Sequence, residues 1–399
     1  MKIFANFIVV TALFVSCSSD KQTNVGLAFI DVTKNYPEKE IFLNDIAEVT
    51  YLYLNSDDDE YLYQSSFLST SEHTVAVYDN SSGNILFFSK DGSPKSRFNH
   101  LGNGPGEYRR RPLGIVYNEV ADELFVYDRN NIIQVYSSIG EHKRTITLPQ
   151  EIEVNGLRIL KDHSLFFHDG GISFKARIDA LLSNQKFNGV PFHIFYRISQ
   201  TNGEVIDSVK IPALYSETSI IYEGELLETP TNLFMKSSDG ILLCSPGTDT
   251  VYLYRNDKTL VPVLYQIPST ALLKNPVQFI DICFDGGEYQ FIKVITVRQG
   301  EVHAGIFPSK HYVRYKETGE IFSQKLLLSD YKDKEFIIDN NVSGGGKSFN
   351  EENTCFFELS LYELKQAYRE NKLSGKLKEL VATLNEDKDN NVFMLLDFK

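Results

Sequence analysis

An internal repeat constrains the fold of this chain more than any other feature of the sequence. Residues 75–92 read VAVYDNSSGNILFFSKDG, and residues 124–140 read LFVYDRNNIIQVYSSIG. Each copy contains a strand that ends in Tyr-Asp, a polar turn, and a second strand that ends in an aromatic residue, with glycine four residues later. Weaker copies end near residues 198, 254 and 315. The copies recur at intervals of about 48 to 62 residues, which is the length of one four-stranded blade with its loops.

These repeats predict an all-β protein, because period-2 alternation around turn residues is typical of β-hairpins. Five visible copies, together with strand patterns at 48–54 (EVTYLYL) and from Asn391 (NVFMLLDFK), give about six blades. We therefore expect a single six-bladed β-propeller over residues 27–399, in which the two ends of the chain share a blade. The alternative is a pair of β-sandwich domains. The absence of a Pro/Gly/Ser-rich linker favours the single domain.

One segment departs from the strand pattern. Residues 359–386 carry leucine, alanine and valine at spacings of three and four, which predicts two amphipathic helices that break near Ser374-Gly375. We expect this short C-terminal helical insertion to pack as a cap on the propeller rim. The alternative is a helix that docks a partner protein.

The N-terminus has the pattern of an export signal. Lys2 precedes an apolar stretch that is too short to span a bilayer, and Leu13-Phe14-Val15-Ser16-Cys17 resembles a lipobox. We expect residues 1–16 to be a lipoprotein signal peptide, Cys17 to be lipidated, and residues 17–26 to form a tether. An ordinary secretory signal with a chance cysteine is the alternative. The expected location is the outer membrane, on its periplasmic face or at the cell surface.

Charge and cysteine content exclude several classes of function. The formal net charge of −13 argues against binding to nucleic acid, because phosphate backbones are repelled. Apart from Cys17, three cysteines remain, so at most one disulfide can form within the chain. Cys244, Cys283 and Cys355 show no metal-ligand spacing, and we expect them to be buried free thiols. The sequence predicts no cofactor and no metal site.

The segment from His100 to Tyr108, HLGNGPGEY, resembles the G-x-GPGEY signature of the 6-bladed beta-propeller lipoproteins, a group similar to NHL-repeat proteins. Residues 41–62 resemble the first module of that family, and DNNVFMLLDFK resembles its closing strand. The resemblance covers nearly all of the chain after the signal peptide. It implies a propeller lipoprotein that acts as a binding or interaction module, often in the acquisition of glycans and other nutrients. It supplies no catalytic residues.

The loop after this signature holds the candidate ligand-binding residues. Arg109, Arg110 and Arg111 lie together in an otherwise acidic chain, where guanidinium groups can clamp a carboxylate, a sulfate or a uronic acid. Tyr108 beside them can stack on a sugar ring. The glycines and Pro105 predict a rigid turn between blades, and the segment lacks the Gly-Lys-Ser/Thr ending of a phosphate-binding P-loop.

Two further segments, FHDGG at 167–171 and FDGG at 284–287, predict equivalent tight hairpins.

The sequence therefore predicts a cell-envelope propeller that binds a glycan or an envelope protein and is not an enzyme. The first alternative is a propeller glycan lyase or hydrolase that uses acids and Arg109–Arg111 at the central channel. The second is a structural subunit of an outer-membrane uptake complex that docks through residues 359–386. An enzyme requires a pocket where acids, histidine, tyrosine or arginine converge from several blades. A scaffold would instead expose a broad apolar patch.

Overall fold

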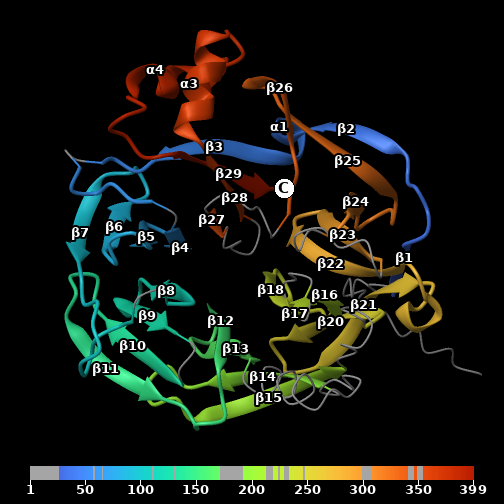
Figure 1. Cartoon of the computed structure of the whole chain (residues 1–399), viewed down its shortest axis with the longest axis horizontal. Helices are drawn as coiled ribbons and strands as arrows, with labels where there is room; N and C mark the ends of the chain where they lie inside the picture. The colour runs from blue at the N-terminus through green and yellow to red at the C-terminus, as the bar shows by residue number, and fades with distance from the viewer. Residues whose placement is uncertain are drawn as a thin grey trace, which may run out of the picture.

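The computed structural model describes residues 27–56, 59–64, 66–109, 112–128, 131–170, 192–212, 219–222, 225–228, 233–245, 248–298, 307–339, 346–347 and 354–399. Six sheets stand around a central axis like the blades of a propeller, as Figure 1 shows. The predicted all-β, six-bladed fold is confirmed. We number the blades I to VI in the order in which their inner strands follow along the chain.

The first three blades each contain four consecutive antiparallel strands. Blade I contains β4 (Ser66–Thr70), β5 (Thr74–Asp79), β6 (Ile85–Ser89) and β7 (Pro94–Phe98), and β27 (Gly346–Lys347) pairs with β4. Blade II contains β8 (Gly114–Asn118), β9 (Glu123–Tyr127), β10 (Ile132–Tyr136) and β11 (His142–Thr147). Blade III contains β12 (Val154–Ile159), β13 (Leu165–Asp169), β14 (Phe192–Ile198) and β15 (Val205–Pro212). A separate hairpin follows, made of β16 (Ser219–Tyr222) and β17 (Glu225–Glu228).

Blades IV, V and VI each combine strands from distant parts of the chain. Blade IV contains β18 (Phe234–Ser237), β19 (Gly240–Leu243), β20 (Thr250–Arg255), β21 (Leu260–Ile267) and β1 (Ala28–Asp31). The turn η2 (Thr270–Leu272) leads to blade V, with β22 (Val277–Gly286), β23 (Tyr289–Val297), β24 (Ser309–Tyr315), β25 (Ile321–Leu328), β26 (Tyr331–Phe336) and β2 (Glu38–Phe42). Blade VI contains β28 (Thr354–Leu359), β29 (Val392–Phe398) and β3 (Ala47–Tyr53), which follows the short α1 (Leu43–Ile46).

The two ends of the described chain close the ring together. β3 pairs antiparallel with β29, with Ala47 opposite Phe398 and Tyr53 opposite Val392, so the expectation of a shared blade is confirmed. Before it reaches blade VI, the N-terminal segment adds β1 and β2 in parallel to the outer edges of blades IV and V. Covering an outer edge strand removes a template for pairing with another chain.

The repeat positions read from the sequence fall at the same place in each blade. The aromatic residues Phe88, Tyr136, Tyr254 and Tyr315 lie at or near the ends of the third strands β6, β10, β20 and β24. In three of these blades a glycine four residues later turns the chain into the fourth strand with positive φ, as at Gly140 with φ +88°, and in blade IV Lys258 takes this position with φ +68°. This conformation costs glycine little because it lacks a Cβ atom.

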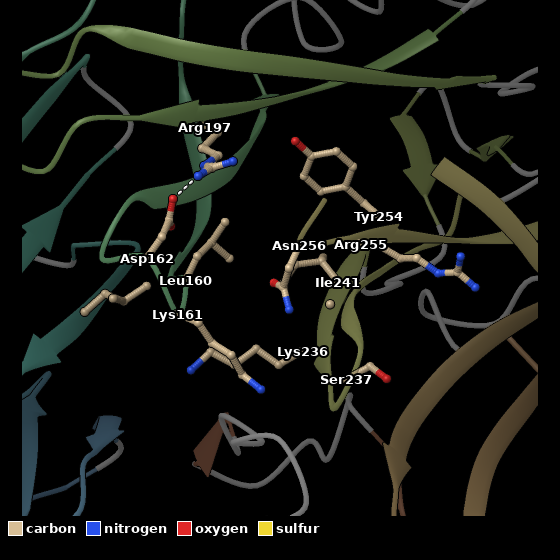
Figure 2. Close-up of a pocket in the computed structure, with 12 residues that line it drawn as sticks. Leu160, Lys161, Asp162, Arg197, Lys236, Ser237, Ile241, Tyr254, Arg255 and Asn256 are labelled. Atoms are coloured by element: carbon tan, nitrogen blue, oxygen red, sulfur yellow. Dashed lines mark hydrogen bonds and ion pairs between the residues drawn. The ribbon is translucent and has the colours of Figure 1, made fainter. Parts of the chain in front are cut away.

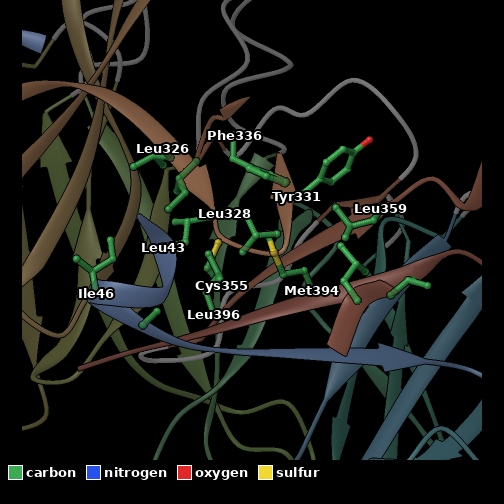
Figure 3. Close-up of a cluster of buried hydrophobic side chains, with 14 of the residues drawn as sticks. Leu43, Ile46, Leu326, Leu328, Tyr331, Phe336, Cys355, Leu359, Met394 and Leu396 are labelled. Carbon is green, nitrogen blue, oxygen red and sulfur yellow. The ribbon is translucent and has the colours of Figure 1, made fainter. Parts of the chain in front are cut away.

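Apolar residues pack between neighbouring blades, and the two predicted helices extend one of these cores. The helices are α3 (Leu361–Arg369) and α4 (Gly375–Thr383), and Leu364, Leu377 and Val381 are buried against blades V and VI. Figure 3 shows other members of this core, among them Leu326 and Met394. The helical insertion is confirmed. Its apolar side packs on the propeller, as the rim-cap hypothesis expects.

Alternation of strand direction gives the propeller two distinct faces. The turns between first and second strands, and between third and fourth strands, lie on one face, which we call the lower face. The remaining turns and the blade-to-blade connections lie on the opposite, upper face. Asp169 ends the second strand of blade III, whereas Asp285 lies near the end of the first strand of blade V. The prediction that FHDGG and FDGG form equivalent hairpins is therefore wrong, because these strands run in opposite directions.

The described residues were also searched for disulfide bonds, membrane-spanning helices and metal sites. Cys244, Cys283 and Cys355 are buried free thiols, as expected. Within the described residues, no helix is long and apolar enough to cross a membrane. In that same part of the chain, no group of three or more His, Cys, Asp or Glu residues could hold a metal ion.

Candidate functional site

A cavity on the lower face between blades III and IV collects positive charge. Its volume is about 320 Å³, and it is lined by Lys161, Arg197, Lys236 and Arg255, with Asp162 as the single acidic residue. We call this cavity the basic cleft. Figure 2 shows that the Arg255 side chain points away from the cavity, so the other three cations and the carboxylate give a local formal charge of +2 (3 − 1), in a chain whose net charge is −13. A concave site of one sign focuses its field and attracts the opposite charge.

Each cation is positioned by a turn or by the end of a strand. Lys161 lies in the turn between β12 and β13, where Asp162 accepts hydrogen bonds from the backbone and side chain of Ser164 at 3.2 and 2.6 Å. Lys161 Nζ donates to the Ser238 carbonyl oxygen at 3.4 Å, which links the first turns of blades III and IV. Lys236 lies on the inner strand β18, and Arg255 ends β20. The packing angle between two blades therefore sets the distances within the cleft.

Arg197 is the most firmly held of the four cations. Its guanidinium group donates to Asp162, and its Nε donates to Ser164 Oγ at 2.8 Å. Figure 2 shows this pair on one side of the cleft, together with Lys161 from the turn in blade III and Lys236 from strand β18 in blade IV. The Arg197 side chain is only 12% exposed. A guanidinium fork that already binds a carboxylate fixes the wall of the cleft and is not available as a fork for a second carboxylate.

Aromatic packing forms the base of the basic cleft. Tyr254 stacks on Phe166 of blade III with ring centroids 5.8 Å apart, and its hydroxyl group donates to Asp207 Oδ2 at 2.7 Å. Burial, followed by the hydrogen bond to Asp207, raises the pKa of Tyr254 to about 12. The phenol is therefore neutral at physiological pH. Tyr254 and Phe166 therefore form the packed floor of the basic cleft, below its charged side chains.

The structure places Tyr108 and Arg109, two of the predicted site residues, away from the basic cleft. Tyr108 is 3% exposed, its hydroxyl group donates to the Gly83 carbonyl oxygen at 2.7 Å, and it accepts the His100 N–H at 3.0 Å. The ring packs edge-on against Tyr136, with centroids 5.8 Å apart. Tyr108 therefore anchors its loop in the core, and its ring has no exposed face for a sugar.

The GPGEY segment is a structured connection between β7 and β8. Glu107 Oε2 accepts the Gly104 N–H at 2.7 Å, and the Tyr136 hydroxyl group donates to the Gly106 carbonyl oxygen at 2.7 Å. Gly106 has φ +73°, which other residues rarely adopt. The interpretation as a rigid turn between blades is confirmed.

Arg109 follows this loop on the upper face. It is exposed and lines a cavity of about 120 Å³ beside the loop. The basic cleft opens on the opposite face, so Arg109 does not contribute to it. Arg110, Arg111 and Cys17 lie outside the described residues, and their roles stay predictions.

A second cavity, of about 520 Å³, lies between blades V and VI and is bordered by β26 and α3. His311 and Asp339 line it, with His311 Nε2 at 3.0 Å from Asp339 Oδ2. Behind them, Lys293 Nζ lies 2.8 Å from Asp339 Oδ1 and 3.6 Å from Asp281 Oδ2. Burial would lower the pKa of Lys293, but the two carboxylates outweigh burial and raise it. Lys293 is therefore a buried cation at neutral pH.

Sequence reasoning did not find the basic cleft. Its members lie at positions 161, 197, 236 and 255, on strands and turns of two blades, and form no local motif. An alignment of the blade repeats would have placed Lys161 and Lys236 near the first turns of neighbouring blades, on the same face. The equivalent positions of these two lysines in neighbouring repeats are the feature of the sequence that could have revealed the cleft.

Comparison with known proteins identifies the family. The family model described as 6-bladed beta-propeller matches residues 19–241, more than half of the chain. The chain belongs to the 6-bladed beta-propeller family. This finding agrees with the resemblance carried by the GPGEY segment. No curated protein matches the sequence.

Solved structures support the same fold. A protein of Bacteroides fragilis that is described as exported is similar, with a TM-score of 0.60 and 15% identity, over 93% of this chain and 99% of that one. Virginiamycin B lyase from Staphylococcus aureus matches with a TM-score of 0.41 and 12% identity, over 88% of this chain and 99% of the lyase. Identities this low show the fold alone, and the second similarity is too weak to carry an argument about activity.

Proposed function

We propose that this protein is an exported, lipid-anchored binding module that holds a small anionic ligand in the basic cleft. The observation that carries the proposal is that three cationic side chains from two blades, Lys161, Arg197 and Lys236, lie around one cavity of about 320 Å³. Small-molecule sites are concave and have a few well-placed polar groups. The cleft has this form, and its positive charge contrasts with the charge of the whole chain.

Two features favour binding over catalysis at this cleft. Its single carboxylate, Asp162, is already paired with Arg197, so it does not provide the two acids that glycoside hydrolysis uses. Tyr254 is buried and its pKa is raised, so its hydroxyl group is a poor base at neutral pH. The arrangement can hold and orient an anion.

A glycan array on the chain from Ser18 onwards tests the proposal. This form contains every described strand and helix. We expect binding to acidic glycans, with neutral glycans giving no signal. Binding is expected to disappear when Lys161 and Lys236 are both changed to Gln and to persist when Arg109 is changed to Ala. If only the Arg109 change abolishes binding, the ligand site lies on the upper face and the basic cleft is not the site.

The anchor is proposed on the lipobox at Cys17 and on the exported relative from Bacteroides fragilis. Two acyl chains or an equivalent second signal give stable attachment to a membrane, whereas a bare protein with this charge is repelled by an anionic surface. The variant Cys17→Ser is expected to leave the membrane fraction for the soluble fraction. A variant that still sediments with membranes would contradict the anchor.

A catalytic role at the cavity between blades V and VI is the second candidate. The observation that favours it is the His311–Asp339 pair at 3.0 Å, because a carboxylate that orients a histidine is a common part of acid–base sites. Turnover of a glycan by the wild-type chain, lost in His311→Asn, would support a lyase or hydrolase. The scaffold alternative has less support, since the apolar residues of α3 and α4 listed in the fold are buried on the propeller.

A further inference from the structure

We infer that the outer edge of blade III is a docking site for a partner protein, which adds an acidic extended segment to residues 208–211 of β15 as a further strand. This inference goes beyond the proposed function, because it concerns a different surface of the propeller and a protein ligand. It follows from a comparison of the outer strands of the six blades.

Blade V shows how the outer edge of a blade holds such a segment. β2 lies on the outside of this blade (Figure 1) and pairs in parallel with β25, so that Glu40 lies opposite Lys325. Lys325 Nζ lies 3.6 Å from Glu40 Oε2 and 3.8 Å from Glu38 Oε1. Beside this ion pair, Ile41 lies opposite Leu326, and both side chains are buried in one core. A lysine and a buried apolar residue of the outer strand therefore hold an added strand that carries acids and one isoleucine.

The outer strand of blade III repeats this arrangement. Residues 208–211 of β15 read SVKI, and residues 323–326 of β25 read SQKL, within two strands of eight residues each. The exposed Lys210 and the fully buried Ile211 take the places of the lysine and the leucine of β25. In the described part of the chain, β15 is the last strand of its sheet, and Lys210 has no ion-pair partner. Among the described strands, none fills on blade III the position that β2 fills on blade V.

The outer edges of the other blades are covered or carry groups that discourage pairing. β1 covers β21, and Glu48 is the exposed residue of β3. β7 begins with proline and carries a lysine and an arginine, and β11 begins with histidine, lysine and arginine. Proline and cations are the devices by which edge strands avoid pairing with other chains.

β15 lacks these devices along most of its length. Its proline, Pro212, is the last residue of the strand, and its cation is the single Lys210. Val205 and Ile206 at its start are each 47% exposed. An edge strand with unpaired N–H and C=O groups and exposed apolar side chains is the surface that β-augmentation uses, in which a peptide joins a sheet as a new strand.

The residues of this edge define the partner. A segment that pairs with β15 as β2 pairs with β25 places acids opposite Ser208 and Lys210 and an apolar residue opposite Ile211. A second copy of this chain fits less well, because its own acidic strand β2 is already paired and because two chains of net charge −13 repel each other. The occupant is therefore an extended segment of another protein, with the pattern acid-x-acid followed by isoleucine or valine.

Fluorescence polarisation with a labelled peptide of residues 37–43 (PEKEIFL) tests the inference on the chain from Ser18 onwards. This peptide contains the sequence of β2 and has the required pattern. We expect saturable binding to the wild type. Hydrogen–deuterium exchange with the peptide present is expected to show new protection in β15, because an added strand pairs with its open edge.

A double-mutant cycle locates the contact. Lys210→Gln is expected to weaken the acidic peptide about fivefold, because an exposed ion pair contributes up to about 1 kcal/mol. The same substitution leaves the affinity unchanged for a peptide that carries Glu38→Gln and Glu40→Gln, since that peptide has no charge to lose. Lys376→Gln, which removes an exposed lysine on α4, is the matched control and leaves both affinities unchanged. Melting by circular dichroism checks that each variant is folded.

The remaining outcomes overturn the inference. If the acidic peptide does not bind, binds Lys210→Gln as tightly as the wild type, or protects a segment other than β15, this edge is not the docking site. If sedimentation velocity shows a dimer that Lys210→Gln dissociates, the edge pairs two copies of this chain and a partner protein is the wrong occupant.

Discussion

Replacing Lys293 with methionine tests the buried charge network of blade V. Lys293 is 4% exposed in its side chain and lies between Asp281, which is fully buried, and Asp339. The sheet aligns two of these side chains, because Asp281 and Lys293 are direct cross-strand partners on β22 and β23, and Asp339 approaches Lys293 from the segment after β26. Methionine keeps the length of the side chain and removes its charge. The variant therefore leaves two carboxylates without their buried cation.

The magnitude follows from the cost of breaking a buried ion pair. Removing one partner of such a pair costs about 3–5 kcal/mol, because the remaining charge stays desolvated. Unfolding entropy of about 2.1 cal/mol/K per residue gives about 0.8 kcal/mol/K for the propeller, so we expect the melting temperature to fall by about 4–6 °C. Circular dichroism at neutral pH measures this shift. Lys210→Met is the exposed control and is expected to stay within about 0.5 kcal/mol of the wild type.

The pH dependence gives the same reasoning a second check. Without Lys293, burial raises the pKa of the two carboxyl groups in the folded variant above the values in its unfolded state. The folded variant then binds more protons, so its stability recovers as the pH falls towards those raised values and is lost as the pH rises through them. The melting difference from wild type should therefore be smaller at pH 5 than at pH 8. An equal difference at both pH values, or a shift no larger than that of the control, would refute the buried network as a source of stability.

Three further predictions concern the turns and the thiols. Gly92→Ala is expected to lower the free energy of unfolding by more than about 2 kcal/mol, because φ is +87° and a Cβ atom would collide with the carbonyl oxygen of Tyr53. A melting temperature within about one degree of the wild type would contradict this. Lys258→Gly is expected to stabilise the chain by about 0.5–1 kcal/mol in the same assay, since Lys258 has φ +68° where other blades place glycine; a loss of stability would contradict this. Burial raises the pKa of Cys244 and of Cys355, so neither thiol is expected to react with a thiol reagent at pH 8 before unfolding; prompt labelling of the folded chain would contradict this.

The sequence predicted most of the propeller because each blade repeats the same physical requirements. A third strand must end in a large residue that fills the space between blades, as Tyr136 does, and the next turn needs positive φ, as at Gly140. These requirements are local and therefore visible. The parallel pairing of Ala28 with Leu264 at the edge of blade IV was not predictable in the same way, since an edge strand shows only weak patterning and its partner is distant in sequence.

The candidate site was predicted less well, for two physical reasons. A tyrosine in a loop can point outwards or anchor the loop, and the sequence does not separate these cases. Tyr108 proved to be an anchor because the Gly83 carbonyl oxygen and the neighbouring ring hold it inside. The cations of the basic cleft, by contrast, meet only because two blades pack side by side. Lys161 and Lys236 are far apart in the chain, and no local pattern links them.

The most direct test of the basic cleft as the ligand site is a crystal structure of the chain from Ser18 onwards with tungstate, a tetrahedral oxyanion whose anomalous scattering locates it without ambiguity. We predict a tungstate peak in the cleft between blades III and IV, within hydrogen-bonding distance of Lys161 or Lys236, at concentrations where the Lys161→Gln, Lys236→Gln variant shows none. A peak beside Arg109 on the upper face, with the cleft empty, would contradict the account.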